Sequence, residues 1–353
     1  MGSPERTKVR AFHLNRDGID LKQGLQLTIV IFCAVIVLDY FFGAVGIIAG
    51  LAALFVMLAD FKGPLRSRLK LLGSFTLIGT AVAVIAGITG PYMWLVALSV
   101  LIFAFAGTLL QAYGSHIGKM MYLLILWFLM AYSFGYTPYD TRSTAFGFLI
   151  GSLASICYIV LVSHFSSKKQ GTAPLNQEGN ATAGGIRVQL NWNSPIFRFA
   201  VVRSVLLSIA IIMGWKLFPT EAYWVAITIL VIIIEDPHQI IVSGVERATG
   251  TLLGAVIAIS ILGLFSDPII SLLVFLLAIF LMFSFRRVNY AIFVFFMTIM
   301  LMSTIAIGGS DVTTVGIERL LAVTSGVALA FLGIGIIKLI SQKKKHSGVH
   351  SSG

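Results

Sequence analysis

The sequence predicts an all-α polytopic membrane protein, with about twelve transmembrane helices in two similar six-helix halves. Three observations support this fold class. The 353-residue chain is 58% hydrophobic and only 11% charged, whereas soluble domains carry about 25% charged residues. Apolar runs long enough to cross a bilayer recur along its length. A pattern of arginines and glycines in the first half also returns in the second half, as expected for an internal duplication.

Twelve apolar segments are expected to span the membrane. They cover residues 25–40, 43–59, 69–88, 92–110, 120–134, 145–162, 199–217, 222–234, 248–265, 269–285, 290–307 and 320–340. The expected parts are an N-terminal segment (1–24), a first half (25–165), a linker (166–198), a second half (199–340) and a disordered basic tail (341–353). The linker is polar and contains Gly, Asn and Thr, which indicates a flexible connection.

Basic residues are distributed unevenly between the two sides of these spans. Of the 25 Lys and Arg residues, 22 fall on one side, and only Arg142, Lys216 and Arg319 fall on the other. Cytoplasmic loops collect Lys and Arg, so both termini are expected in the cytoplasm and the protein in the plasma membrane. The net charge of +11 then follows from topology, and no nucleic-acid partner is expected.

Two arginines recur at matching positions in the two halves. Arg68 corresponds to Arg247, and Arg142 corresponds to Arg319. Six spans per half give the halves the same orientation, and division of each half into three plus three spans gives inverted repeats. On this topology Arg68 and Arg247 lie at the inner face, and Arg142 and Arg319 lie at the outer face. Transporters built from inverted repeats bind their substrates where the repeats meet.

Arg142 and Arg319 are unusual for two reasons. They depart from the positive-inside distribution, and they are expected at helix N-termini, where the helix dipole disfavours a cation. An anionic substrate would compensate, because a guanidinium at a helix N-terminus binds carboxylates well. A structural ion pair is the alternative, with these carboxylates as candidate partners: Asp140, Asp311 and Glu318.

Glycines near Arg247 predict close helix packing. Gly250 and Gly254 follow Arg247 at the small-xxx-small spacing that lets helices approach closely. This spacing places Arg247 at a packed seam, although an ordinary cytoplasmic charge is the alternative. Gly147 and Gly151 repeat the spacing in the first half.

The segment 222–234 is shorter than a membrane span requires, and its counterpart 43–59 is also short. Short segments at matching positions of two halves indicate a binding site. Tyr223, Trp224 and Thr228 are therefore expected to contact the body of the ligand. Anchoring at the membrane interface is the alternative for the two aromatic residues.

Titratable residues near these features are candidates for proton coupling. They are Asp236, His238, Glu246 and Glu318. Helix termination and solvation in an inner loop are the alternative roles for Asp236 and His238.

No pattern of an enzyme or a cofactor site is present. The six histidines form no metal-binding pair, and Cys33 and Cys157 both fall inside expected spans. Phosphate-binding loops and nucleophile motifs are also missing from the sequence. We therefore expect no enzymatic activity, no metal and no cofactor.

The second half resembles the fusaric-acid-resistance-like (FUSC) family. The resemblance rests on Tyr223-Trp224, Thr228, Asp236-Pro237 and the run from Glu246-Arg247 through Gly250-Thr251 to Gly254. It is good over 215–265 and weaker over 290–340, and Arg68 and Gly73 repeat part of it in the first half. That family includes the bacterial aromatic acid exporters and is related to the aluminium-activated malate channels. The resemblance implies export of small, often aromatic, carboxylates or conduction of organic anions.

The function that we predict is transport or export of small organic anions, coupled to protons. Arg247, Arg319, Arg68 and Arg142 would attract the carboxylate. A passive organic-anion channel is one alternative, and a membrane scaffold or lipid-binding protein without transport is another. The expected partners are the anion and the lipid bilayer. The oligomeric state stays open, and a homo-oligomer is one option.

Overall fold

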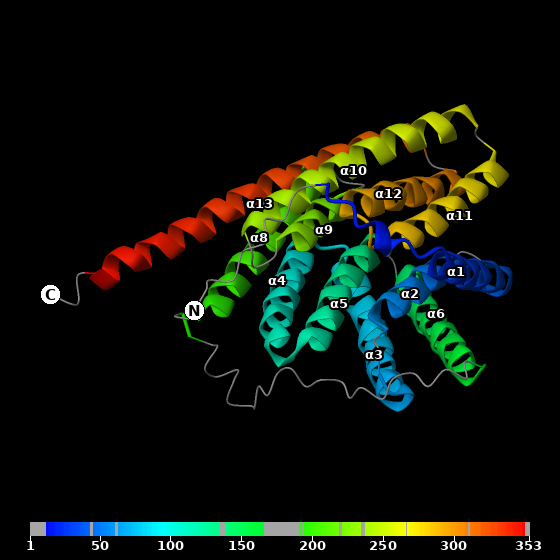
Figure 1. The fold of residues 1–353 in the computed structure, drawn as a ribbon, viewed down its shortest axis with the longest axis horizontal. Helices are drawn as coiled ribbons and strands as arrows, with labels where there is room; N and C mark the ends of the chain where they lie inside the picture. The colour runs from blue at the N-terminus through cyan, green and yellow to red at the C-terminus, as the bar shows by residue number, and fades with distance from the viewer. Residues whose placement is uncertain are drawn as a thin grey trace. The chain divides into compact units, whose positions relative to one another are not determined.

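The computed structural model describes residues 12–349 except 43–44, 61–62, 135–137, 166–190, 193, 219–220, 234–236, 266 and 310. Within these residues the regular structure is entirely helical (Figure 1). The fold class predicted from the sequence is therefore confirmed as all-α. Most of the predicted linker at 166–198 lies outside the described part of the chain.

The described residues form twelve α-helices and two short 3-10 helices. The first half contains α1 (Leu21–Phe42), α2 (Val45–Ala59), α3 (Leu65–Thr89), α4 (Met93–Leu110), α5 (Ser115–Phe134) and α6 (Pro138–Phe165). The second half contains α8 (Pro195–Leu217), α9 (Tyr223–Ile232), α10 (Pro237–Leu264), α11 (Pro268–Phe285), α12 (Tyr290–Ile307) and α13 (Val312–Val349). The 3-10 helices are η1 (Arg16–Gly18) and η2 (Gln111–Tyr113).

Ten of the described helices are long and apolar enough to cross a membrane. The shorter apolar helices are α2 and α9, and α9 has ten residues. Ten residues rise about 15 Å, half the thickness of a bilayer core. The chain is thus a multi-pass membrane protein, but twelve complete spans are not confirmed.

Proline and side-chain caps define many helix starts. Proline is the first residue of α6, α8, α10 and α11, where its missing N–H costs nothing. Asp267 caps α11 by accepting a hydrogen bond from the Ile269 amide at 2.7 Å. Asn289 caps α12 through the Ala291 amide at 2.7 Å, and Asp311 caps α13 through the Thr313 amide at 3.0 Å.

The same helix pairings occur in both halves. In the first half α2 packs on α6, and α3 packs on α5 and α6; in the second half α9 packs on α13, and α10 packs on α12 and α13. The pairs α4–α5 and α11–α12 also correspond. This agreement supports the duplication inferred from the sequence. The inverted three-plus-three arrangement within each half stays a prediction.

The chain divides into two compact units whose boundaries differ from those of the halves. One unit contains Met1–Thr28 and Gly214–Gly353, and the other contains Ile29–Met213. In the first of these, the Asp20 amide at the start of α1 donates to the Ser284 carbonyl of α11 at 3.0 Å. In the other, Ser208 of α8 donates to the Ala97 carbonyl of α4 at 2.7 Å. The start of α1 therefore contacts α11 in one unit, and α8 contacts α4 in the other.

Aromatic residues fill the core of the unit formed by 29–213. Trp127 of α5 is fully buried, and its indole N–H donates to the Gly79 carbonyl of α3 at 3.0 Å. Its ring lies 4.5 Å from that of Phe148 on α6. The predicted glycine seam of α6 is confirmed, because a side chain at Gly151 would collide with the backbone of Ala49 on α2.

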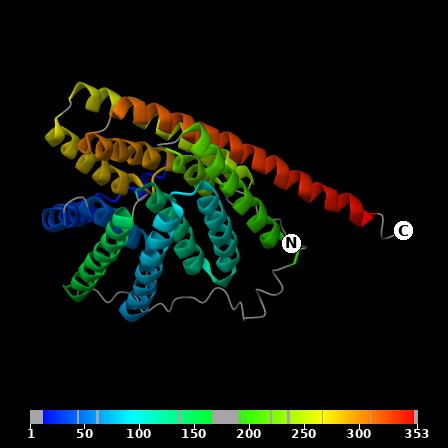
Figure 2. The ribbon, with the colours of Figure 1, turned by 180° about the vertical axis from the view of Figure 1, so that it is seen from behind.

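Two helices of the second half are longer than predicted. The sequence placed spans at 248–265 and 320–340, whereas α10 begins at Pro237 and α13 at Val312. Residues 341–349 were expected to be disordered, but their backbone continues α13, which extends past the helices it packs against (Figure 2). Lys and Gln are good helix formers, so a helix already nucleated at Val312 propagates through them.

Candidate functional site

The short helix α9 forms the centre of the candidate site. Almost all of its residues are buried, including Trp224 and Thr228. These two residues are four positions apart and therefore lie one turn, or about 6 Å, apart along one face. The Thr228 hydroxyl donates to the Trp224 carbonyl at 2.7 Å. The hydroxyl oxygen can still accept a hydrogen bond from a neighbouring helix.

Arg247 of α10 contacts this face of α9. Its side chain is 2% exposed. Its Nε donates to Thr228 Oγ1 at 3.2 Å, and its Nη1 donates to the Tyr290 hydroxyl of α12 at 3.1 Å. Both partners are neutral, so these hydrogen bonds orient the guanidinium without neutralising it.

Arg319 of α13 contacts α9 one turn earlier. Its side chain is 1% exposed, and its Cζ lies 3.8 Å from the centroid of the Trp224 ring. A guanidinium over an indole face is a favourable cation–π contact, and more so when it is desolvated. Its Nε has no hydrogen-bond partner among the described residues.

Close packing with glycines brings these helices together. A Cβ at Gly250 would lie 2.5 Å from the Ala291 carbonyl oxygen, and one at Gly254 would lie 2.6 Å from that of Phe295, so α10 packs directly on the α12 backbone. A Cβ at Gly326 of α13 would lie 2.7 Å from Thr228 Cβ. The packed seam predicted beside Arg247 is confirmed.

We call the group formed by Trp224, Thr228, Arg247, Tyr290 and Arg319 the arginine site. The largest charge effect on Arg319 comes from the Glu221 carboxyl group, in the turn before α9, and Arg247 repels Arg319 more weakly. Among the described residues no carboxylate lies within 4.0 Å of either guanidinium, because the ion pair found there joins Arg68 to Asp60. Burial of an ion costs several kcal/mol even after relaxation. The arginine site therefore holds two buried cations, neither in ion-pair contact with a described carboxylate.

The expectation that Arg247 and Arg319 lie at opposite membrane faces is wrong. Both contact α9 within one helical turn, which cannot cover a bilayer core of about 30 Å. The physical reason is that α10 and α13 each begin well before their arginine, so Arg247 and Arg319 lie inside helices rather than at their ends.

Glu221 also belongs to this neighbourhood, although the sequence did not single it out. It lies in the turn before α9, is 7% exposed, and accepts a backbone hydrogen bond from the Trp224 amide at 3.1 Å. Burial raises the pKa of Glu221 to about 7, and the Arg319 charge opposes this shift. Tyr290 was also missed, because a tyrosine opening an apolar span resembles an interfacial anchor.

Glu246 has a structural environment rather than an open one. It is buried, and its Oε1 accepts hydrogen bonds from the Phe12 amide at 2.8 Å and from Asn289 Nδ2 at 3.0 Å. Asn289 Nδ2 also donates to the His13 carbonyl at 3.2 Å. Glu246 thus fastens the N-terminal segment to the start of α12.

The structure describes the other residues predicted for proton coupling only in part. Asp236 lies outside the described residues, and of His238 the structure describes only the helical backbone at the start of α10. Glu318 is half-buried beside Arg319 on α13 and acts electrostatically on Glu221. The proton-coupling role of these residues stays a prediction.

Among the predicted ligand contacts, Trp224 and Thr228 lie in the arginine site, and Tyr223 adjoins it, with its ring 5.1 Å from that of Trp224. The first-half arginines differ from their counterparts. Arg68 is paired with Asp60 through Nε at 2.9 Å and Nη2 at 2.5 Å. Arg142 is exposed on α6. Neither is part of the unit that holds the arginine site.

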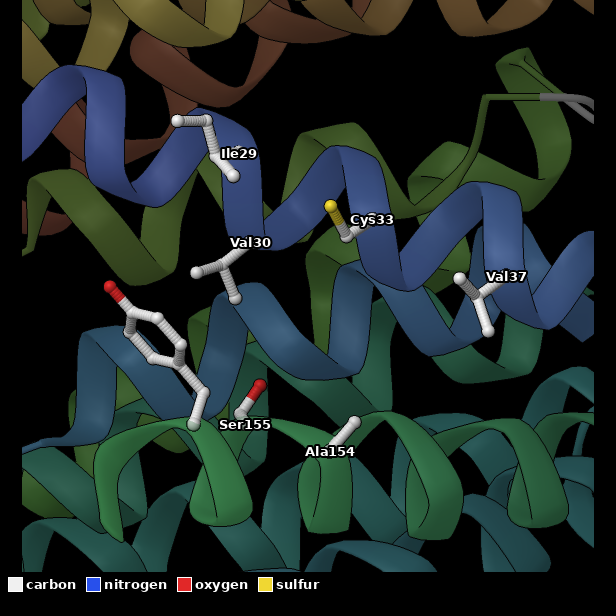
Figure 3. Close-up of a pocket in the computed structure, with 7 residues that line it drawn as sticks. Ile29, Val30, Cys33, Val37, Ala154 and Ser155 are labelled. Atoms are coloured by element: carbon white, nitrogen blue, oxygen red, sulfur yellow. The ribbon is translucent and has the colours of Figure 1, made fainter. Parts of the chain in front are cut away.

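A different feature is an apolar groove between α1 and α6 (Figure 3). It has a volume of about 310 Å³ and is lined by Ile29, Val30, Cys33, Val37, Ala154, Ser155 and Tyr158. The described lining residues are uncharged, and Ser155 and Tyr158 contribute its hydroxyl groups. Cys33 and Cys157 are free thiols.

These helices define a multi-pass membrane protein with two buried arginines beside a short helix. Residues 200–333 match the family model described as fusaric acid resistance protein-like. The matched region runs from α8 into α13 and contains the arginine site, so the resemblance of the second half is confirmed. Searches of curated proteins and of solved structures gave no match.

Proposed function

We propose that this protein transports small organic anions across a membrane and binds the anionic group between Arg247 and Arg319. One observation carries the proposal. Two fully buried guanidiniums contact one turn of α9, and no described carboxylate forms an ion pair with either of them. Charge-assisted hydrogen bonds from guanidinium to carboxylate are strong and geometrically specific. A carboxylate entering this site would offset both the repulsion and the burial of the two cations.

The composition of the site indicates the rest of the ligand. Trp224 and Tyr223 supply adjacent aromatic rings, and Thr228 and Tyr290 supply hydroxyl groups. Aromatic side chains pack well against flat apolar groups. An organic carboxylate with an aromatic body therefore fits better than an inorganic anion. The name of the matched family, resistance to an acid, agrees with movement of such compounds out of the cell.

The location and topology are part of the same proposal. The plasma membrane, with both termini in the cytoplasm, follows from the distribution of 25 basic residues along the chain. Arg68 and Arg142 would then attract the carboxylate in the first half, where Arg68 donates a hydrogen bond to Asp60. Coupling to protons makes the protein a carrier, whereas a passive channel would conduct without it.

Flux into proteoliposomes tests the proposal. Uptake of radiolabelled benzoate by the wild-type protein is compared with that of Arg319→Gln and Arg247→Gln. Loss of one charge-assisted hydrogen bond predicts a decrease in affinity of about tenfold or more. Arg287→Gln is the matched control, because Arg287 is an exposed arginine after α11 in the same unit. Normal gel-filtration profiles with undiminished benzoate flux in both arginine variants would contradict the proposal.

The same preparation separates a carrier from a channel. A carrier predicts saturable benzoate flux with a fixed number of protons moved per anion. Currents that continue at more than about 10⁵ ions per second without a proton gradient exceed the turnover of ordinary catalytic cycles. Such currents would favour the channel.

A further inference from the structure

Three polar atoms with incomplete hydrogen bonding gather around one end of α9. Glu221 Oε2, Trp224 Nε1 and Arg319 Nε are buried, and none meets the distance and angle of a hydrogen bond with a described residue. The Glu221 carboxyl group is nevertheless near the polar groups of Trp224 and Tyr223, which act on its pKa as weak hydrogen-bond donors. Buried polar atoms without partners are uncommon in folded proteins and require a reason. Here the Arg319 guanidinium lies over the face of the Trp224 indole ring, and the Glu221 backbone carbonyl accepts a hydrogen bond from the Trp224 amide.

The groups that act on Glu221 come from two helices. The charges of Arg319 and Glu318 act on it from α13, and the side chains of Trp224 and Tyr223 act on it from α9 as hydrogen-bond donors. Arg319 is the cation of this group, so an ionised Glu221 partly neutralises the guanidinium that would hold the anion. A protonated Glu221 leaves that guanidinium with its full charge.

We propose that Glu221 takes up the coupling proton and that its protonation strengthens anion binding at Arg319, so that proton and anion bind together. This inference rests on the proposed function, because it assigns the coupling residue of the same site. The step is a simple protonation. A proton from the aqueous phase adds to the Glu221 carboxylate, and the resulting neutral carboxyl can donate a hydrogen bond.

The titration range of Glu221 suits this role. Burial raises its pKa to about 7, and the neighbouring Glu318 charge acts in the same direction. Arg319 acts in the opposite direction. An anion bound beside Arg319 would use that positive charge and so raise the pKa of Glu221 further. Linkage is reciprocal, so an anion that promotes proton uptake is itself bound more tightly when the proton is present.

The sign of this coupling distinguishes it from exchange. If proton and anion bind together, the neutral pair crosses the membrane, which is cotransport. If they excluded one another, the protein would exchange protons for anions. Electrostatics favours the first, because Glu221 and a carboxylate carry the same charge and compete for Arg319.

Binding of benzenesulfonate at several pH values tests the inference. This probe is an aromatic anion that does not titrate near neutral pH, so any pH dependence belongs to the protein. Coupling energies of 1–3 kcal/mol are typical, so the Kd should rise by about fivefold or more from about pH 6 to about pH 8. The wild-type protein in weakly buffered solution at about pH 7 should also take up protons when benzenesulfonate is added.

Variants locate the coupling group. Glu221→Gln resembles the protonated state, so it should bind benzenesulfonate tightly at every pH and take up no proton. Asp267→Asn, which removes the exposed carboxylate that caps α11, should keep the wild-type pH dependence. A wild-type Kd that falls as the pH rises would overturn the inference, as would a pH dependence lost in Glu318→Gln but kept in Glu221→Gln.

The two proposals fail in different ways. If wild-type protein binds neither benzenesulfonate nor benzoate at any pH, the proposed function fails, and the inference fails with it. If the anions bind and Arg319→Gln abolishes the binding, but proton uptake is absent, then the inference fails alone.

Discussion

Arg319 lies over the indole ring of Trp224, with its Cζ 3.8 Å from the ring centroid, and both side chains are almost completely buried. The contact joins the longest described helix, α13, to the shortest α-helix, α9. It gives the guanidinium a favourable partner that leaves its hydrogen-bonding edge available. A carboxylate partner would occupy that edge, so the indole face holds Arg319 in place and preserves its capacity to bind an anion.

Replacement of Trp224 tests this contact. We expect Trp224→Leu to be less stable than Trp224→Phe, because phenylalanine keeps an aromatic face for Arg319. The cation–π part of the difference should be about 0.5–2 kcal/mol. Thermal unfolding of the two variants in the same detergent measures it, and equal stabilities would show that the ring face contributes nothing.

Arg247→Met should separate stability from function. Methionine has a similar length and no charge, and replacing buried ions by apolar groups is often neutral or stabilising by about 1–4 kcal/mol. We expect the ligand-free variant to be at least as stable as the wild type, because Arg247 repels Arg319. Benzoate binding should be lost.

The opposite result would support a scaffold protein. If Arg247 serves only to hold the helices together through Thr228 and Tyr290, Arg247→Met should destabilise the protein in the absence of any anion. Parallel measurement of melting temperature and benzoate affinity distinguishes these outcomes.

Gly250→Val should disturb the seam between α10 and α12. An added Cβ would lie 2.5 Å from the Ala291 carbonyl oxygen, where the backbone must move to make room. Overpacking of this kind costs about 1–3 kcal/mol. Gly263→Val is the control on the same helix, because no atom lies within 4 Å of its Cβ position. Similar melting temperatures for both variants would contradict the packing described for Gly250.

Glu246→Ala should release the N-terminal segment. The carboxylate binds the Phe12 amide and Asn289 Nδ2, and loss of a buried acceptor leaves those donors unsatisfied at a cost of about 1–3 kcal/mol. Hydrogen exchange at residues 12–20 should become faster. The pH dependence of benzenesulfonate binding in Glu246→Ala should stay as in the wild type. If this pH dependence is lost in the variant, Glu246 takes part in proton coupling.

Stability without ligand should depend on pH through Glu221. Its pKa in the folded protein is raised to about 7, above the value of about 4.3 for a free glutamate. The folded state therefore holds the proton more tightly, and this stabilisation is complete below about pH 4.3 and is lost as the pH rises through about 7. We expect the melting temperature to fall over this interval and Glu221→Gln to flatten the decrease. An unchanged slope in that variant would assign the titration to another group.

The sequence predicted the helices well, but it predicted poorly where Arg247 and Arg319 lie along them. Span boundaries were placed where the apolar runs stop, so Arg247 and Arg319 became the residues before 248–265 and 320–340. In the structure both helices continue through the charge. A single buried arginine interrupts an apolar pattern, but it does not end a helix when hydroxyl groups accept its hydrogen bonds or an indole ring packs against it.

Composition of the site was predictable only in part. Trp224, Thr228, Arg247 and Arg319 stood out because they combine motif, spacing and unusual charge. Glu221 did not, because one glutamate in a turn resembles an ordinary solvated residue. Its position two residues before Tyr223, between two apolar segments, was the available signal. Only the packing of α13 against α9 brings Glu221 to Arg319.

The most direct measurement is the position of a bound anion. The protein would be crystallised with 4-bromobenzoate, and the bromine located by its anomalous scattering. We predict a single strong peak beside α9, with the carboxylate between the guanidiniums of Arg247 and Arg319. A peak confined to the α1–α6 groove, or bromobenzoate that binds with both guanidiniums untouched, would contradict the account.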